Sequence, residues 1–460
     1  MVSRVASSLY FGLCASSVLA TASYGHPPPY DAKQTCTISS QYAASNGTAD
    51  DSPTIASALA RCADGGTVVF SEGVDYNVFN PVSATNLSSV TIQVYGNLHL
   101  PQNVTQMQEL FNTTTAASGS SNLYWFIFQG PGVSLEGTPN ITTGWINSYG
   151  QGWWDANPVN GTGIAGRPHL MLFNTTNGSM RHFKSRKPIA WNVQVRGDNI
   201  TISDTIIDAY STSGRFPFNT DGFDVTATNV KITNSVIYNG DDAIAVQSGS
   251  HNVTFQGGTI GYQTHGMSIG SLGQNQASFA NVSDIHFDDI TVVNGVYAAR
   301  FKSWEGGQGI ASNISWTNMR VYNTTFPIFV TQTYINQGNS QTQIESGGTT
   351  GRPNNSTVNM ENFTWANFTG TINTFQPGDL SCVTDVSRSA VHVFEPLRLT
   401  DHRSSHVGTM SVSLTSCTPR RWSLSVTPNS HARASSSPTS RSSRRALMRR
   451  AWCASMLLQR

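Results

Sequence analysis

The chain has 460 residues, of which 40 are glycine and only 12% are charged. This composition suits many short strands and tight turns and argues against a protein built of long helices, and the length permits a single repetitive all-β domain. The net charge of +1 hides a segregation, because residues 1–386 hold 15 basic and 24 acidic residues, whereas 387–460 hold 12 Arg and two acidic residues.

The amino terminus has the pattern of a secretory signal peptide over residues 1–22. Arg4 supplies the positive charge, Leu9–Leu19 is mostly apolar, and Ala-Thr-Ala at 20–22 gives the small-x-small cleavage pattern. The apolar segment is too short to span a bilayer, and the sequence offers no other candidate span. We therefore predict a secreted, extracellular protein that does not bind membranes.

Cysteine usage and glycosylation sequons agree with export. Cys14 is lost with the signal peptide, and Cys36 and Cys62, 26 residues apart, are predicted to form one disulfide. An odd set of cysteines remains, namely Cys382, Cys417 and Cys453. The 17 Asn-x-Ser/Thr sequons, none of them after Asn367, fit a glycosylated secreted protein.

Residues 52–62 begin with serine and have the apolar spacing of one short helix, which we expect to cover the open end of a sheet structure. From about residue 66 onward, short β-branched segments alternate with Gly, Asn and Asp. A nine-residue unit then recurs at intervals of 30, 23, 32, 29 and 44 residues, with copies that begin at Asn199, Asn229, Asn252, Asp284, Asn313 and Thr357. We interpret Asn229, Asn252 and Asn313 as turn residues.

Alternate positions within each copy are apolar, as in Ile200 and Ile202 or Val230 and Ile232, which indicates a strand with one buried face. Helical repeats would instead need apolar spacings of three and four. A strand repeat of this length predicts an all-β solenoid, a right-handed single-stranded parallel β-helix whose coils stack on one another. A β-sandwich is the alternative, but it gives no reason for the same unit to recur.

Ionisable side chains gather between residues 219 and 302, each beside a glycine or another small residue. They are spaced about one coil apart, so stacking would place them along one face of the solenoid. The set comprises three carboxylates, an imidazole and two cations: Asp221, Asp241, Asp242, His265, Arg300 and Lys302. Arg300 and Lys302 are separated by one residue, so on a strand both side chains point the same way.

Four short motifs resemble, in order and spacing, those of the polygalacturonase family, glycoside hydrolase family 28: Asn-Thr-Asp at 219–221, Gly-Asp-Asp at 240–242, His-Gly at 265–266 and Arg-Phe-Lys at 300–302. Each motif is common alone, but the ordered four inside a strand repeat are specific. The wider resemblance covers about residues 30–385 and includes AGRPHLMLFN at 165–174. SIGSLGQ at 268–274 is similar to the fungal exo-acting branch.

This resemblance implies an exo-polygalacturonase that hydrolyses galacturonic acid from the ends of pectic chains without a cofactor or metal. Asp241 would be the general acid, and Asp221 and Asp242 would hold the attacking water, which leads to inversion. Crowded carboxylates make this workable, because like charges raise the pKa of one member. His265 would orient or tune the acid.

The resemblance also implies how the pectic substrate is bound. Arg300 and Lys302 would pair with its carboxylate, and Asn219 and Tyr334 would contact the sugar. For each of these residues a structural role is the alternative, such as a backbone cap for an aspartate or a solvated strand face for the cations. We expect residues 23–386 to form the catalytic domain and the protein to act as a monomer.

Two other groups of residues have less specific interpretations. Trp153 and Trp154 are predicted to pack in the core rather than to bind sugar. The basic run at 181–187 is either a solvated loop or a further subsite for a carboxylate.

Residues 387–460 depart from the family pattern, with 17 Ser, 12 Arg and a single glycine, Gly408. We predict that this tail is disordered or reflects a reading-frame or splice error in the gene model. An RNA-binding Arg/Ser segment does not fit behind a signal peptide, so no nucleic-acid partner is expected.

Three alternative functions remain at this point. A rhamnogalacturonan galacturonohydrolase differs only in the penultimate sugar. A pectate lyase shares the β-helix but requires Ca²⁺ and eliminates rather than hydrolyses. A polysaccharide-binding β-helix would have no catalytic use for Asp241.

Overall fold

Parallel strands dominate the chain, because the repeated apolar alternation forms strands that pair from one coil to the next. The computed structural model describes residues 34–158, 163–334, 356–372, 411–418 and 421–426. The first coils contain β1 (Thr35–Thr37), β2 (Thr67–Phe70), β3 (Asp75–Asn77), β4 (Val82–Ala84), β5 (Thr91–Val94), β6 (Asn97–His99), β7 (Tyr124–Pro131), β8 (Ser134–Gly137) and β9 (Ile146–Asn147).

The central coils contain β10 (His169–Arg181), β11 (Lys184–Arg186), β12 (Val193–Ser203), β13 (Ile206–Asp208), β14 (Phe223–Tyr238), β15 (Asp242–Val246), β16 (His251–Gly261), β17 (Gly266–Leu272), β18 (Phe279–Val293) and β19 (Tyr297–Trp304). The last coils contain β20 (Gln308–Thr317), β21 (Arg320–Thr324), β22 (Phe326–Tyr334), β23 (Thr357–Ala366) and β24 (Thr369–Ile372). Two further strands follow, β25 (Ser411–Thr418) and β26 (Arg421–Val426).

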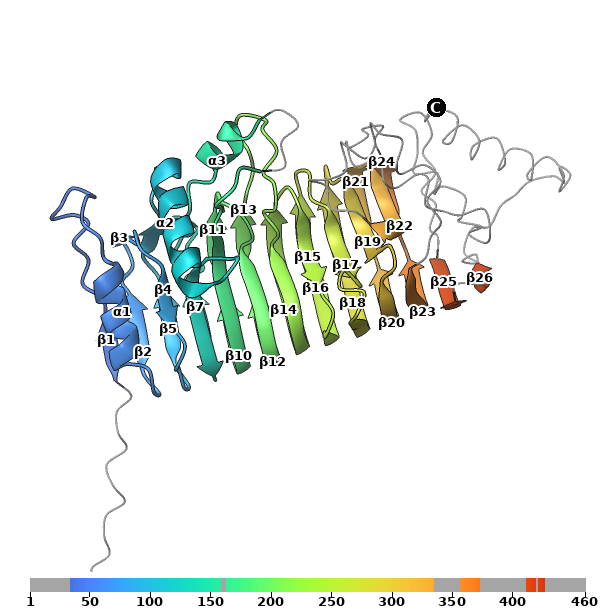
Figure 1. The fold of residues 1–460 in the computed structure, drawn as a ribbon, viewed down its shortest axis with the longest axis horizontal. Helices are drawn as coiled ribbons and strands as arrows, with labels where there is room; N and C mark the ends of the chain where they lie inside the picture. Colours follow the sequence, from blue (N-terminus) through green and yellow to red (C-terminus); the bar gives the residue numbers. More distant parts are fainter. Residues whose placement is uncertain (1–33, 159–162, 335–355, 373–410, 419–420, 427–460) are drawn as a thin grey trace, which may run out of the picture. The chain divides into compact units, whose positions relative to one another are not determined.

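Successive coils pair in parallel, which makes this a right-handed parallel β-helix, as the sequence predicts (Figure 1). One ladder runs through β12, β14, β16, β18, β20 and β23. A second ladder runs from the start of β14 through β15, β17, β19 and β22. The second ladder carries Asp242, Arg300, Lys302 and Tyr334, and the other predicted site residues lie just before its strands.

The core is an apolar stack between the ladders. One row of this stack aligns Ile200, Val230, Val253, Ile285, Ile314 and Phe363, all of them buried. Each coil buries its apolar face only against its neighbours, so stability accumulates coil by coil.

The register corrects one repeat boundary. Ser312 pairs with Glu361 and Ile314 with Phe363, so the counterpart of Asn313 is Asn362 and not Thr357. The alternation of apolar residues is the same on both parts of β23, and a period of two alone does not distinguish the two registers.

The predicted turn asparagines adopt the left-handed backbone conformation, with φ of 54° at Asn229, 55° at Asn252 and 56° at Asn313. Asparagine tolerates this conformation better than other side-chain-bearing residues. Their amides also bond between coils, as where Asn252 Nδ2 donates to Asn229 Oδ1 at 2.7 Å. The structural interpretation of these residues is therefore confirmed.

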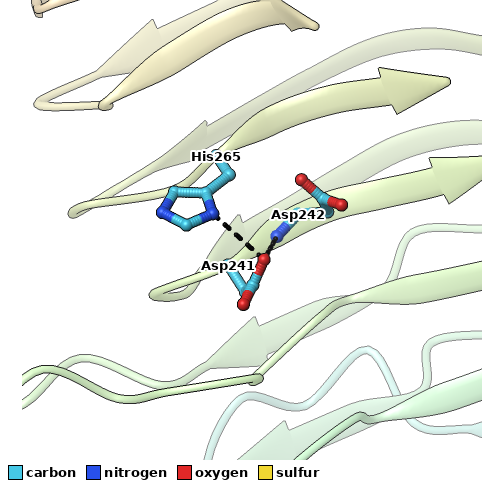
Figure 2. Close-up of side chains that lie close together, drawn as sticks. All are labelled: Asp241, Asp242 and His265. Atoms are coloured by element: carbon cyan, nitrogen blue, oxygen red, sulfur yellow. Dashed lines mark hydrogen bonds and ion pairs between the residues drawn. The ribbon is translucent and has the colours of Figure 1, made fainter. Parts of the chain in front are cut away.

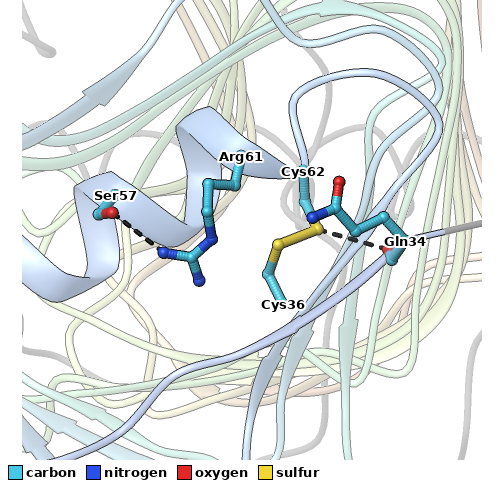
Figure 3. Close-up of a disulfide and its surroundings, with 5 residues drawn as sticks. All are labelled: Gln34, Cys36, Ser57, Arg61 and Cys62. Atoms are coloured by element: carbon cyan, nitrogen blue, oxygen red, sulfur yellow. Dashed lines mark hydrogen bonds between the residues drawn. A yellow bond between two sulfur atoms is a disulfide. The ribbon is translucent and has the colours of Figure 1, made fainter.

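The predicted first helix is present as α1 (Ser52–Arg61), but Asp51 rather than Ser52 occupies its N-cap. It lies against the first coils, beside β1 and β4 (Figure 1). The disulfide between Cys36 and Cys62 is confirmed and joins β1 to the end of this helix (Figure 3).

Two helices were not predicted. In α2 (Val104–Ser118) only Met107 is fully buried, although Val104 and Leu110 also pack against the core. This spacing of three residues was the available clue in the sequence, and the helix is bounded by the Asn103 cap and left-handed Gly119. The other, α3 (Gln151–Ala156), is too short for a periodic pattern. Trp153 and Trp154 lie in α3 and are buried in the core, as expected.

The basic run at 181–187 is not a solvated loop, because it includes strand β11. Lys184 is buried, and its Nζ donates to the carbonyl oxygens of Thr138 and Asn140 at 2.6 and 2.5 Å. Burial lowers the pKa of Lys184 to about 8. Arg186 lies 3.9 Å from the ring centre of Trp145, so this part of the run holds neighbouring coils together.

Several expectations fall outside the described residues. These are the signal peptide at 1–22, the pairing of Cys382, and most of the tail at 387–460. Within that tail the structure describes only β25 and β26, of which β25 pairs antiparallel with β23.

Candidate active site

The predicted acids and cations reach one place from successive coils. Asp221 lies two residues before β14, Asp242 begins β15, and His265 directly precedes β17. Arg300 of β19 pairs in register with Ser268 of β17. The parallel stacking thus brings together residues that lie far apart in the sequence.

Asp241 lies at the centre of a hydrogen-bond cluster (Figure 2). Its Oδ1 accepts the backbone N–H of Asp242 at 2.9 Å and lies 3.1 Å from His265 Nδ1. Arg300 Nη1 is 3.3 Å from the same imidazole nitrogen. On the other oxygen, Asn219 Nδ2 donates to Asp241 Oδ2 at 3.4 Å. The carboxyl group is therefore held in one orientation.

Asp242 binds the two cations that the family resemblance assigns to a substrate carboxylate. Lys302 Nζ donates to Asp242 Oδ2 at 2.6 Å, and Arg300 Nη1 donates to Oδ1 at 3.4 Å. Ser268 Oγ also donates to Oδ1 at 2.6 Å. Asp242 and Arg300 are each only 1% exposed. Such a buried, paired group is strongly fixed, because removing either partner leaves a buried charge without compensation.

Tyr334 and Trp304 form an aromatic wall beside the cations. Lys302 Nζ lies 5.3 Å from the ring centre of Tyr334, and the rings of Trp304 and Tyr334 meet edge to face at 5.1 Å. An ammonium over a tyrosine ring gains cation–π attraction that grows as water is excluded. The aromatic wall thereby helps to hold the lysine in place.

Three carboxylates of the cluster, Asp221, Asp224 and Asp241, have pKa values shifted in different directions. Burial, reinforced by the charge of Asp241, raises the pKa of Asp221 well above its ordinary value. Asp224 shifts in the same direction, because of burial and the charge of Asp242. Burial also opposes ionisation of Asp241, but His265, Lys302 and Arg300 together bring the pKa of that group below its ordinary value. A proton shared in this cluster therefore resides on Asp221 or Asp224 rather than on Asp241.

All the predicted site residues line a single cavity of about 780 Å³: Asn219, Asp221, Asp241, Asp242, His265, Arg300, Lys302 and Tyr334. A volume of this order accommodates one or two sugar units. The cavity combines clustered carboxylates with a cationic flank, which is the chemistry needed to bind an acidic sugar and to move protons at its linkage.

Three residues of the site were not assigned from the sequence. Arg167 donates to Asn219 Oδ1 at 2.7 Å, Asp224 lines the same cavity, and Ser268 bonds Asp242. Each lies within or beside a stretch quoted above for its resemblance to the family. Position in such a stretch was the available clue, since no periodicity separates them from their neighbours.

Asp241, Asp242 and His265 place ligand-type atoms within 4.8 Å of one another. The charges beside them do not suit a metal ion, because Lys302 Nζ already lies 2.6 Å from Asp242. A divalent cation would have to displace this ammonium.

Asp224→Asn is expected to raise the melting temperature at pH 7 by roughly 1–2 °C for each kcal/mol of stability gained, the scaling for a domain of more than 250 residues. Among the described residues neither oxygen of Asp224 has a hydrogen-bond partner. Its raised pKa means that the folded protein holds a proton which the unfolded chain releases above about pH 4. Asp224 therefore lowers stability as pH rises past that value, and asparagine removes the effect.

The measurement is thermal unfolding of wild type and variant at pH 4 and pH 7, and the gain should shrink towards pH 4. Asp198→Asn is the matched control, since this exposed carboxylate has a lowered pKa through bonds to Thr228 and Asn229. Its replacement should give no gain at pH 7. An equal gain for Asp224→Asn at both pH values would contradict the explanation.

Within the described part of the chain, no helix is long and apolar enough to cross a membrane.

Comparison with known proteins gives consistent matches. The family model described as glycosyl hydrolases family 28 matches residues 82–407. The chain is 54% identical over 378 residues to "Probable exopolygalacturonase C" of Aspergillus fumigatus, a match that covers 81% of this chain and 82% of that protein. A protein of the same name from Aspergillus niger is 54% identical over 371 residues, covering 80% and 81% of the two chains.

Among solved structures, endo-xylogalacturonan hydrolase from Aspergillus tubingensis superposes with a TM-score of 0.60 at 26% identity. This match covers 74% of this chain and 85% of that one.

Proposed function

The chain belongs to glycosyl hydrolases family 28, and from this membership we propose that it is an exo-acting hydrolase that releases galacturonic acid from the ends of pectic polygalacturonan chains. The observation that carries the proposal is the cavity in which three clustered carboxylates face a buried lysine and arginine. The exo action is supported by relatives named exopolygalacturonase that are 54% identical over most of their length.

We assign the general acid to Asp241, whose Oδ2 would protonate the glycosidic oxygen as the bond to the sugar carbon breaks. Water would attack that carbon from the opposite face and pass its proton to a carboxylate, which inverts the configuration. Asp221 is better suited than Asp242 to take this proton, because Lys302, Arg300 and Ser268 already occupy the oxygens of Asp242. Asp242 would instead orient the water.

The acid must be protonated when substrate is bound, although His265, Lys302 and Arg300 favour its ionised form. A bound galacturonate would favour protonation of Asp241, because its carboxylate would approach Lys302 and Arg300 and offset their positive charge. The pKa of Asp241 then rises, and the proton shared with Asp221 moves to the acid. Binding of an acidic sugar thereby prepares the site for hydrolysis.

We further propose a secreted monomer, in which residues 1–22 form the signal peptide and 23–386 the catalytic domain. The disulfide between Cys36 and Cys62 fits an oxidising compartment.

Incubation with oligogalacturonates of defined length tests the function. We expect galacturonic acid as the sole early product, released with inverted anomeric configuration in proton NMR. Activity should persist in chelator, and no unsaturated product should absorb in the ultraviolet. Mixed oligomers would indicate endo action, and an unsaturated product would indicate a lyase. Hydrolysis only of chains with a rhamnose next to the terminal galacturonate would favour the rhamnogalacturonan alternative.

A further inference from the structure

Arg167 holds the segment that carries Asn219. Its Nη1 donates to the carbonyl oxygen of Phe218 at 2.8 Å, its Nη2 to Asn219 Oδ1 at 2.7 Å, and its Nε to the carbonyl oxygen of Ile164 at 3.1 Å. Gly163 leaves room for the guanidinium, since a Cβ there would lie 2.4 Å from Arg167 Cζ. The residue lines the cavity of the acids and is built into its wall.

These contacts decide which way the Asn219 amide faces. A guanidinium only donates hydrogen bonds, so Asn219 must present its oxygen to Arg167. The NH₂ group is then directed to Asp241, where Nδ2 lies 3.4 Å from Oδ2. Without Arg167 the amide would be free to rotate by half a turn and present its oxygen to Asp241 instead.

The orientation matters for a general acid. When Asp241 carries a proton on Oδ2, the NH₂ group of Asn219 cannot accept a hydrogen bond from it. The O–H of Asp241 therefore remains available to a glycosidic oxygen in the cavity. With the amide reversed, Asn219 Oδ1 would accept that proton in a hydrogen bond. Such a bond would stabilise the protonated carboxyl and make it a weaker acid.

We propose that Arg167 is a positioning residue that acts through Asn219, and that it prevents the amide from capturing the proton which Asp241 must deliver. This inference rests on the proposed function, because it assumes that Asp241 protonates a leaving group. It assigns to Arg167 an effect on proton transfer rather than on substrate affinity.

Charged or titratable side chains from every neighbouring coil face Asp241. They are Arg167 before β10, Asp221 and Asp224 at β14, Asp242 at β15, His265 at β17, Arg300 and Lys302 on β19, and Tyr334 on β22. Arg167 interacts electrostatically with both Asp241 and Asp221. Its removal should therefore raise the pKa of both groups and move the whole pH–rate profile in one direction.

The test compares full-length wild type with Arg167→Met and Arg167→Lys on trigalacturonate across pH. Arg167→Met should lower kcat by about 10- to 100-fold, the effect of a misplaced catalytic group, with KM changed less than about threefold. Its bell-shaped profile should move to higher pH by about half a unit or more. Arg167→Lys keeps the charge and should keep the position of the profile, at an intermediate kcat.

Arg181→Met serves as the matched control, since this arginine is 63% exposed and 3.6 Å from its partner Asp204. It should match wild type. In an Asn219→Ala background, Arg167→Met should cause little additional loss, because the two residues act in series.

Three outcomes would overturn the inference: a lower kcat with an unmoved profile, losses that add fully in the double variant, or a rise in KM alone. The last would make Arg167 a substrate-binding residue. Inactive wild type on galacturonates would instead refute the proposed function, so the two failures are distinguishable. Circular dichroism of each variant identifies any that fails to fold. If Arg167→Met does not fold, the kcat and pH profile of Arg167→Lys provide the test instead.

Discussion

Asp241→Asn is expected to lower kcat on galacturonates by about 10²- to 10⁴-fold, the contribution of a positioned general acid. KM should stay within a few-fold, since the amide has nearly the same shape and its oxygen can still accept the N–H of Asp242, now at 2.9 Å from Asp241 Oδ1. Steady-state kinetics on oligogalacturonates measure both constants. Asp289→Asn, a change on an exposed side chain, is the control and should be silent.

The choice of leaving group tells the acid from the base. An aryl galacturonide with an acidic phenol leaves without protonation, so Asp241→Asn should lose far less activity on it than on the natural linkage. Asp221→Asn should lose similar activity on both substrates, because water must be activated in either case. If the losses are reversed between the two variants, the roles assigned to Asp241 and Asp221 are exchanged.

Lys302→Met is expected to reduce kcat/KM on free-acid galacturonates by about 10²-fold or more, in line with 2–5 kcal/mol for a buried, charge-assisted contact. The same change should reduce hydrolysis of the methyl ester much less, because the ester carries no charge for the ammonium to bind. Comparing the two substrates isolates recognition of the carboxylate from other effects of the substitution.

Stability must be measured alongside, because Lys302 also neutralises the buried Asp242 at 2.6 Å. We expect a lower melting temperature for Lys302→Met, since the remaining arginine compensates the carboxylate only in part. Lys231→Met, on the exposed face of β14, is the matched control and should change neither property. Equal losses on the acid and the ester would show that the lysine serves the fold rather than the substrate.

The sequence was sufficient to predict the β-helix, because its apolar alternation recurs with asparagines at equivalent turns. It was insufficient for the register at β23, where both candidate starts have the same alternation, and for α2, whose few apolar residues (Val104, Met107 and Leu110) stand among polar ones. Alternation predicts which face of a strand is buried, but it does not fix which residues pair with one another.

The candidate site was predictable where its residues stand in ordered motifs with one-coil spacing. That Arg300 and Lys302 bind Asp242 in the structure was not foreseeable, because alternation places side chains on a face without choosing their partners. Arg167 lies 52 residues before Asn219, a separation that matches no single coil. Only the folded chain shows that the segment before β10 reaches the turn that precedes β14.

The order of the coils has a consequence for experiments on this protein. Because Asp221, Asp242, His265 and Lys302 each belong to a different rung, no fragment that ends before β19 can assemble a working set. A partly folded chain with its first rungs in place would be rich in β-structure by spectroscopy yet catalytically inert. Catalytic activity therefore appears only once the coils through β19 have formed. Recovery of activity after denaturation should lag behind recovery of secondary structure.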